Sequence, residues 1–126
     1  MINVGIRNFT ELELQCRCCG LLNMSEEFLI RLQAFRYMLG KPLTVTSGCR
    51  CKKHNSSPSV GGEANSCHIG EGKKCTAADV TNKNCQEIYL QACKSGLFNE
   101  VIWYKAKNIV HLGLDRGQKG NFFITK

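Results

Sequence analysis

Scarce metal-binding residue types stand together in one segment, NSCHIGEGKKCTAADV, at residues 65–80. His68 is one of three histidines in the chain, and Asp79 is one of only two aspartates. Asp79 is flanked by small and apolar residues, where a carboxylate without a partner would be very costly to bury. Because a metal ion can supply that partner, the segment suggests metal chemistry.

A third candidate ligand, His111, lies in the middle of an expected strand. Strand alternation places His111 and Gly113 on one face and Val110 and Leu112 on the other. Gly113 leaves room beside the imidazole for something to approach. Two imidazoles and one carboxylate form a catalytic zinc set, with the fourth position left for water. The alternative is a hydrogen-bonded core histidine and a turn aspartate, since the chain has no HExxH pattern.

Several elements must position these residues. The pattern predicts helices over 25–39 and 85–95, a short strand within 41–48, a long loop over 52–75, and strands over 77–81, 100–104, 108–114 and 121–125. Ser25 and Asn84 are the expected N-caps, and Glu87 is expected to complete a capping box with Asn84. Helices and strands in this order predict an α+β domain with a mostly antiparallel sheet, spanning residues 1–126.

Composition narrows the class of protein. A chain of 126 residues that is 43% hydrophobic can form one domain with a real core. The net charge of +7 is compatible with an anionic partner. However, the basic residues are scattered, which favours ordinary solubility with a mild preference for acidic surfaces. No apolar run is long enough for a transmembrane helix, and no signal-peptide pattern is visible, so we expect synthesis in the cytoplasm.

The chain has nine cysteines, an odd number that cannot all pair within one chain. Without a signal peptide, stable disulfides are not the default. Two alternatives remain open for the first cysteines. Cys16, Cys18 or Cys19 can join Cys49 and Cys51 in a structural tetrahedral metal site, in which His54 can replace one ligand. Disulfides between the two segments are the competing possibility.

Four short motifs follow one another along the chain: SGCR at 47–50, VGGEANSCH at 60–68, Ala77 with Asp79, and VHLGL at 110–114. In this order and spacing they resemble the zinc D-Ala-D-Ala carboxypeptidase family. That family includes phage L-Ala-D-Glu endolysins and shares its fold with the hedgehog signalling domain. The pair His54-Asn55 and the opening NFTELELQCRCCG are also similar to small phage-type members.

The resemblance implies a zinc-dependent peptidase that cleaves peptidoglycan stem peptides, of a phage or prophage wall-degrading type. It implies that His68, Asp79 and His111 are the zinc ligands and that Arg50 steadies the bound substrate. Ser66 precedes the first ligand as in the family; its hydroxyl either hydrogen-bonds near the site or is that of a plain loop serine. We expect a monomer that acts at the bacterial cell wall, with no nucleic-acid partner and no membrane insertion.

The sequence departs from the family pattern in the segment around the first ligand. His68 and Asp79 are eleven positions apart, a longer spacing than is usual in the family, and the extra residues fall within GEGK at 70–73. This extra loop can line or cover the substrate groove. Cys49 replaces the aromatic residue of the family's Ser-Gly-Tyr-Arg. Cys67 and Cys75 can bridge the extra loop, contact the metal or simply pack.

A further departure concerns the catalytic base. Many family members have an acidic residue three positions before the last histidine, where this chain has Asn108. An amide cannot accept the proton of an attacking water, so Glu100 and Asp115 become the candidate bases. The alternative is an inactive zinc-binding module of the same fold that binds wall peptide or a protein partner. A basic nucleic-acid binder built on the cysteines is less favoured, because the aromatic residues form no basic stripe.

Overall fold

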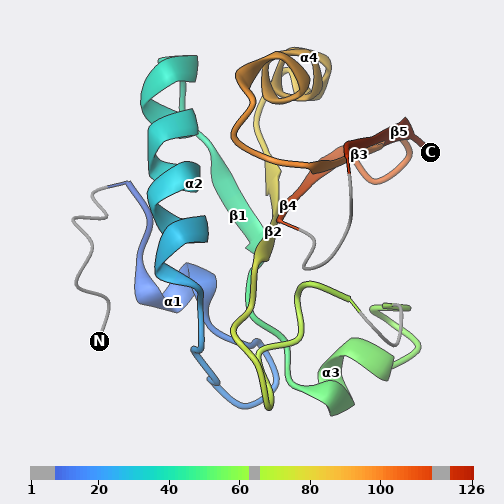
Figure 1. Ribbon diagram of the computed structural model, residues 1–126. Coiled ribbons are helices and arrows are strands. Elements are labelled where there is room, and N and C mark those ends of the chain that lie inside the picture. Colours follow the sequence, from blue (N-terminus) through green and yellow to red (C-terminus); the bar gives the residue numbers. More distant parts are fainter. Residues whose placement is uncertain (1–7, 63–65, 115–119) are drawn as a thin grey trace.

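Four helices and five strands make up the part of the chain that the computed structural model describes, residues 8–62, 66–114 and 120–126 (Figure 1). In chain order they are α1 (Glu11–Leu14), α2 (Glu26–Leu39), β1 (Thr44–Ser47), α3 (Lys52–Ser56), β2 (Ala77–Thr81), α4 (Cys85–Ser95), β3 (Glu100–Tyr104), β4 (Ile109–Gly113) and β5 (Phe122–Thr125). The predicted α+β class is confirmed.

The strands form one mixed sheet in the order β1-β2-β4-β3-β5. All neighbouring pairs are antiparallel except β3 and β5, which run parallel. The prediction of a mostly antiparallel sheet is therefore confirmed. The register between β1 and β2 shifts between Val45 and Ser47, so that Ser47 lies opposite Asp79. Such a bulge re-aims the side chains that follow it.

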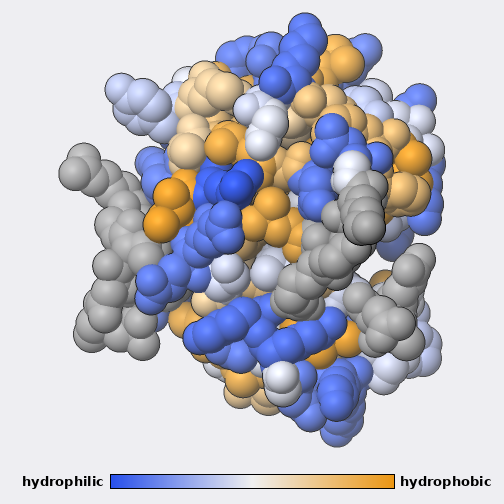
Figure 2. Space-filling view, viewed as in Figure 1, coloured by the Kyte–Doolittle hydropathy of each residue, from blue (hydrophilic) through white to orange (hydrophobic). Residues whose placement is uncertain are grey.

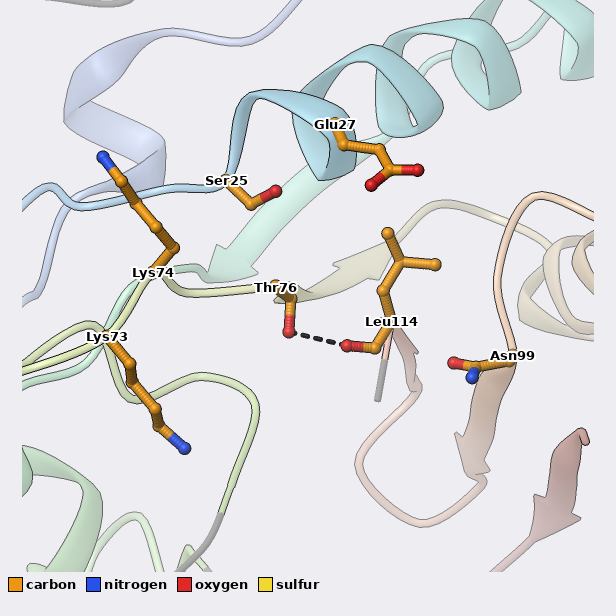
Figure 3. A pocket seen from close by; sticks show the side chains of 7 residues that line it. All are labelled: Ser25, Glu27, Lys73, Lys74, Thr76, Asn99 and Leu114. Atoms are coloured by element: carbon orange, nitrogen blue, oxygen red, sulfur yellow. Dashed lines mark hydrogen bonds between the residues drawn. The ribbon is translucent and has the colours of Figure 1, made fainter. Parts of the chain in front are cut away.

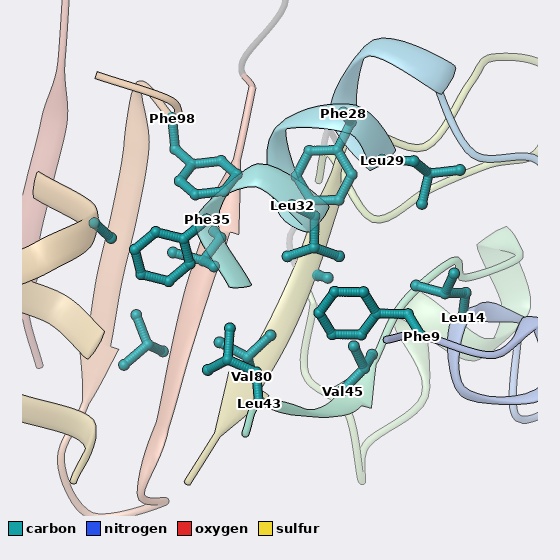
Figure 4. Close-up of a cluster of buried hydrophobic side chains, with 14 of the residues drawn as sticks. Phe9, Leu14, Phe28, Leu29, Leu32, Phe35, Leu43, Val45, Val80 and Phe98 are labelled. Atoms are coloured by element: carbon teal, nitrogen blue, oxygen red, sulfur yellow. The ribbon is translucent and has the colours of Figure 1, made fainter. Parts of the chain in front are cut away.

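Helices α2 and α4 cover one face of the sheet, and the hydrophobic core lies between them and the strands (Figures 1 and 4). Phe28 and Phe35 of α2 pack against Phe98, with ring centroids 6.0 and 5.6 Å apart. Below them, Val80 and Val110 point into the core from β2 and β4 and are fully buried. The buried apolar side chains of α2 are thus part of the core, and the other face of the sheet carries the polar side chains of Asp79 and His111.

The caps of the two long helices agree with the prediction in part. Ser25 Oγ accepts the N–H of Phe28, and α2 ends at Gly40 in the left-handed region, with φ 68°. Asn84 accepts the N–H of Glu87 at the start of α4, but the predicted capping box is wrong. The N–H of Asn84 donates to Asn82 instead, and the Glu87 carboxylate accepts from Lys41, 2.7 Å away.

Two short helices were not predicted from the sequence. In α1, Thr10 and Glu13 form a reciprocal capping box. Helix α3 lies inside residues 52–75, so the prediction of one continuous loop there is wrong. The thiol of Cys51 caps α3 by accepting the N–H of His54. A helix of five residues has too few turns to show an apolar period, which is why the pattern missed it.

Hydrophilic residues are spread over the visible face of the molecule, with hydrophobic residues between them (Figure 2). This distribution agrees with the scattered basic residues in the sequence. None of the helices in the described ranges combines the length and hydrophobicity needed to cross a bilayer.

Candidate metal centre

The register of the sheet brings two of the three candidate ligands together. Asp79 of β2 lies directly opposite His111 of β4. Both side chains are buried, with exposed fractions of 5% and 7%, on the sheet face opposite the core residues Val80 and Val110. The predicted alternation of β4 is confirmed. Opposed residues of antiparallel strands have their Cβ atoms about 5 Å apart, so their side chains can share one metal ion.

The third ligand, His68, reaches the sheet from the loop that follows α3. Its carbonyl accepts the N–H of Arg50 at 2.7 Å, and the N–H of Gly70 donates to the Arg50 carbonyl at 2.9 Å. Ser66 Oγ accepts the N–H of His68 at 3.1 Å. These bonds tie the segment around His68 to the segment around Arg50. They give Ser66 a role in fixing the ligand loop.

The three ligand atoms form a nearly equilateral triangle. His68 Nε2 lies 3.1 Å from Asp79 Oδ1 and 3.2 Å from His111 Nδ1, and His111 Nδ1 lies 3.2 Å from Asp79 Oδ1. Ligands at the usual zinc bond lengths of about 2.1 Å sit about 3.4 Å apart in a tetrahedron. The donor types and their spacing therefore fit a tetrahedral zinc ion.

In each of the three side chains, the polar atom that does not belong to the triangle also has a hydrogen-bond partner. His68 Nδ1 donates to the Gly48 carbonyl at 2.7 Å, which leaves the lone pair on Nε2. His111 Nε2 is hydrogen-bonded to the Glu100 carboxylate, and Asp79 Oδ2 accepts from Arg50 Nη2 at 3.2 Å. Metal-binding histidines in proteins usually have such outer partners, which fix the tautomer and the ring orientation. Each of the three side chains is therefore held from its outer side, and the group could hold a metal ion.

The electrostatics of the group reflect five ionisable side chains, those of Arg50, His68, Asp79, Glu100 and His111, in one largely buried place. Burial alone would raise the pKa of Asp79, but the neighbouring His68 and His111 hold it well below its usual range. Burial lowers the pKa of His68. Burial also acts to lower the pKa of His111, but hydrogen bonds to Asp79 and Glu100 outweigh it and raise the pKa to about 9. Without a metal, a protonated His111 and the Arg50 guanidinium supply the positive charge beside the two carboxylates.

Arg50, the residue expected to hold substrate, is buried in the same centre. Its guanidinium donates to Ser47 Oγ at 3.0 Å, Asn55 Oδ1 at 3.2 Å and Asp79 Oδ2 at 3.2 Å. The structure therefore gives Arg50 a direct contact with Asp79, one of the three candidate ligands. Ser47 and Asn55 were not singled out as site residues. Asn55 was quoted only within the family-like pair His54-Asn55, and its 2% exposed fraction shows that it belongs to the buried centre.

The sheet also explains why Glu100 reaches the site. Glu100 lies opposite Gly113, two residues from His111 along the neighbouring strand β4. A Cβ added to Gly113 would lie 2.9 Å from Glu100 Oε1 and 3.1 Å from His111 Nε2. Gly113 thus leaves the space in which these two side chains meet. Asp115, the other expected base, lies outside the described residues.

Asn108, which replaces the family's acidic residue, lies in the exposed turn between β3 and β4. Its φ of 55° is in the left-handed region, which asparagine tolerates better than most residues do. Its carbonyl accepts from Thr81 Oγ1 at 2.7 Å. The backbone conformation of this turn therefore accounts for an asparagine here.

The cysteines near the centre take no part in it. All nine cysteines are free, so of the alternatives open for Cys67 and Cys75 the bridge is not formed in this structure. The Cys75 thiol interacts with the Cys49 thiol, and both are buried. The group of metal-binding atoms on β2, β4 and the ligand loop consists of His68, Asp79 and His111.

An open hollow of about 460 Å³ lies beside the start of β2 and the end of β4 (Figure 3). It is lined by Ser25, Glu27, Lys73, Lys74, Thr76, Asn99 and Leu114. Thr76 Oγ1 donates to the Leu114 carbonyl at 2.7 Å across its floor. Lys73 comes from the extra loop, so this loop does line a hollow next to the strands of the site. The three metal-binding residues do not line it.

Comparison with known proteins identifies the family of the chain. The family model described as Peptidase M15 matches residues 7–113, a span that contains His68, Asp79, His111, Arg50 and Glu100. No curated protein matches the chain.

Proposed function

The chain belongs to the Peptidase M15 family, and we propose that it is a zinc-dependent peptidase that cleaves the stem peptides of peptidoglycan. The observation that carries the proposal is the triangle of His68, Asp79 and His111, with donor atoms 3.1–3.2 Å apart and every outer atom held by a partner. A D-Ala-D-Ala carboxypeptidase or an L-Ala-D-Glu endopeptidase of phage or prophage origin fits this proposal best, with its action at the bacterial cell wall.

In this proposal His68, Asp79 and His111 hold the zinc ion. Zinc in such a set polarises a carbonyl and lowers the pKa of water, which is the chemistry that peptide hydrolysis needs. His68 stays the correct tautomer because its Nδ1 proton is committed to the Gly48 carbonyl. Burial of all three side chains in a region of low polarity strengthens these electrostatic effects.

Arg50 is proposed to serve both the metal ligand and the substrate. A guanidinium has five N–H donors, and Ser47, Asn55 and Asp79 each accept from one of its nitrogens. The remaining donors can bind a carboxylate or carbonyl of the substrate. Ser66 is proposed to support the site from the loop side, through its bond to the N–H of His68.

Two carboxylates remain candidates for the base that moves the proton. Glu100 has an exposed side-chain fraction of 17% and already contacts His111, so it can exchange a proton at the edge of the site. Asp115 follows β4 by two residues in the sequence. In either case the base comes from a position other than Asn108.

The test uses purified protein and purified peptidoglycan. We expect the wild type to bind zinc and to release either free D-Ala or new amino termini without free alanine, which distinguishes a carboxypeptidase from an endopeptidase. His111→Ala should lose both the zinc of this centre and the cleavage. Val110→Ala is the matched control, because it alters the neighbouring residue on the core face of the same strand and should keep both. A His111→Ala protein that still cleaves would refute the proposal.

One observation favours a second function, an inactive zinc-binding module that binds wall peptide. The family's acidic position is Asn108, in an exposed turn, and Glu100 is already engaged by His111. In that case the wild type would bind zinc in the His68 centre and bind peptidoglycan, while neither product would appear on long incubation with stem peptide.

A further inference from the structure

A second group of possible metal-binding side chains is separate from the group of His68, Asp79 and His111, which is called the M15 centre below. The Sγ atoms of Cys16, Cys19 and Cys51 are all within 4.8 Å of one another. Thiolates at the usual Zn–S length of about 2.3 Å sit about 3.8 Å apart in a tetrahedron, so small side-chain rotations would bring all three to one ion. Cys16 and Cys51 are buried, whereas Cys19 is exposed.

The backbone around these thiols has the form of a small metal-binding turn. Cys16 and Cys19 have Cys-x-x-Cys spacing and are followed by Gly20. The N–H of Gly20 donates to the Cys16 carbonyl at 2.9 Å, and Gly20 has a φ of 77°, which a side chain would strain. The N–H of Cys16 donates to the Leu21 carbonyl at 2.7 Å and closes the turn. The turn thus places two thiols on one side at metal-binding spacing.

The third thiol comes from the start of α3. Cys51 is the N-cap of this helix, and its Sγ accepts the N–H of His54 at 3.3 Å. The N–H of Cys51 in turn donates to Cys16 Sγ at 3.4 Å. Such N–H···S bonds favour a thiolate over a thiol, because they place donors against the negative charge.

Backbone N–H groups of Cys51, Cys19 and Cys18 donate to the Cys16 thiol. Lys53 lies near enough to the Cys18 thiol for its positive charge to act on it. The thiols are therefore grouped together with hydrogen-bond donors and a lysine beside them.

We propose that Cys16, Cys19 and Cys51 bind a second zinc ion, which is structural. The fourth ligand comes from His54 or Cys18. His54 stands three residues after Cys51, where the N3 side chain of a helix folds back toward its N-cap. Cys18 lies close enough for its thiol to interact with that of Cys51. Zinc binding at this site displaces the thiol protons to solvent.

This ion would fix the segment that carries Arg50. The N–H of Cys49 donates to the Leu14 carbonyl at 2.8 Å, just before the Cys-x-x-Cys turn. Cys51 follows Arg50 directly, so a metal between Cys51 and the turn holds Arg50 from both sides. The second site would thereby position an arginine that contacts the ligand Asp79.

The test counts zinc on the full chain, purified under reducing conditions. We expect about two zinc ions per chain in the wild type, about one in His111→Ala, about one in Cys51→Ser and almost none in the double variant. Cys93→Ser, which alters a half-buried thiol of α4 remote from both centres in sequence, should keep about two. The proposal would be overturned if the reduced wild type bound only one zinc ion, the one that His111→Ala loses. It would also be overturned if the Cys51→Ser protein kept the wild-type zinc content.

A second measurement covers the case in which Cys51→Ser does not fold. Mass-spectrometric mapping of alkylated cysteines on the wild type should show Cys16, Cys19 and Cys51 protected by zinc and exposed to the reagent after chelation. Cys93 should react equally in both states. Equal reactivity of the three thiols with and without zinc, or a disulfide joining Cys51 to Cys16 or Cys19, would exclude the site.

Discussion

Each metal-binding side chain of the M15 centre is fixed through its outer atom, and these outer partners differ in kind. His68 is held by a backbone carbonyl, Asp79 by a guanidinium and His111 by a carboxylate. A carboxylate makes the imidazole a stronger base and so a stronger metal ligand. Glu100 should therefore affect how tightly the metal binds, whether or not it also moves a proton.

Glu100→Gln tests this role. The amide keeps the shape of the side chain but removes its charge, so we expect zinc affinity in the His68 centre to fall by about 10- to 100-fold, with little change in the fold. Competition with a chromophoric chelator measures the affinity. Glu27→Gln, an exposed change in α2, is the control and should leave the affinity unchanged. Unchanged affinity with lost turnover at saturating zinc would instead identify Glu100 as the base alone.

The sequence predicts individual residues unevenly. The three ligands could be proposed because their types are scarce and their motifs resemble a family. Gly48 and Asn55 could not be assigned roles in the same way. Gly48 orients His68 through its backbone carbonyl, a group that every residue has. Asn55 contributes through a buried contact with the Arg50 side chain, which the sequence does not show. The fit between Glu100 and Gly113 follows from strand register, which sequence spacing alone does not give.

The segment between β1 and α3 is the element on which the centre depends most. It begins after Ser47, carries Gly48 and Arg50, and runs against the end of α1. A Cβ on Gly48 would lie 2.5 Å from the Leu14 carbonyl oxygen and 2.9 Å from Leu14 Cα. Since both neighbours are backbone atoms, only a shift of one segment could make room.

Gly48→Ala should therefore weaken both the fold and the centre. We expect a loss of roughly 1–3 kcal/mol in the free energy of unfolding, together with weaker zinc binding, because the Gly48 carbonyl orients His68. Denaturant unfolding and zinc titration are the measurements. Thr44→Ala, at an exposed position of β1, should change neither appreciably. A Gly48→Ala protein with wild-type stability would mean that α1 need not approach so closely.

Strong local signals made some elements predictable to the residue. The predicted bounds of β2, α4 and β3 are those of the structure, because caps, glycines and alternation agree there. Helices α1 and α3 were missed since they are too short for an apolar period to show. The Thr10–Glu13 spacing was the available signal for α1, whereas the thiol cap of α3 has no common sequence signature.

The stability of the whole molecule should depend on the titration of His111 only when the metal is absent. In the metal-free protein His111 has a pKa of about 9, above its value of about 6.5 in an unfolded chain. A raised folded-state pKa contributes stability that is complete below pH 6.5 and is lost as the pH rises through 9. Asp79, with its lowered pKa, stays ionised throughout this range and adds no slope.

With chelator present, we expect the wild type to lose on the order of 1–3 kcal/mol of unfolding free energy between pH 6.5 and 9, relative to His111→Ala in the same buffers. Because the variant removes the His111 contribution, the contributions of the other titrating groups cancel in the difference between the two unfolding free energies. With zinc bound, the loss should vanish, because zinc requires deprotonated ligands. Chemical denaturation at the two pH values decides the matter. A metal-free wild type that gains stability relative to the variant over this range would contradict the assignment.

The arrangement of the sheet was the least predictable property. A mostly antiparallel sheet follows from short strands and turns, but the order β1-β2-β4-β3-β5 and the parallel pairing of β5 with β3 depend on contacts distant in sequence. Because α2 and α4 cover one face of the sheet, Asp79 and His111 lie on the other face. For His111, strand alternation in β4 had already predicted the face opposite Val110 and Leu112.

The loop at 71–74 has both ends firmly anchored. Asn23 Nδ2 donates to the carbonyls of Gly70 and Lys73, each at 2.9 Å, and the Asn23 carbonyl accepts the N–H of Cys75 at 2.7 Å. Gly72, at the tip, has open space around its Cα. A fluorophore or a short peptide tag carried on a side chain of this loop would sit close to the hollow lined by Lys73, whereas at Gly72 itself, with a φ of 77°, a side chain would be strained. The molecule thus offers a loop for a reporter that senses ligands arriving at the hollow beside β2 and β4.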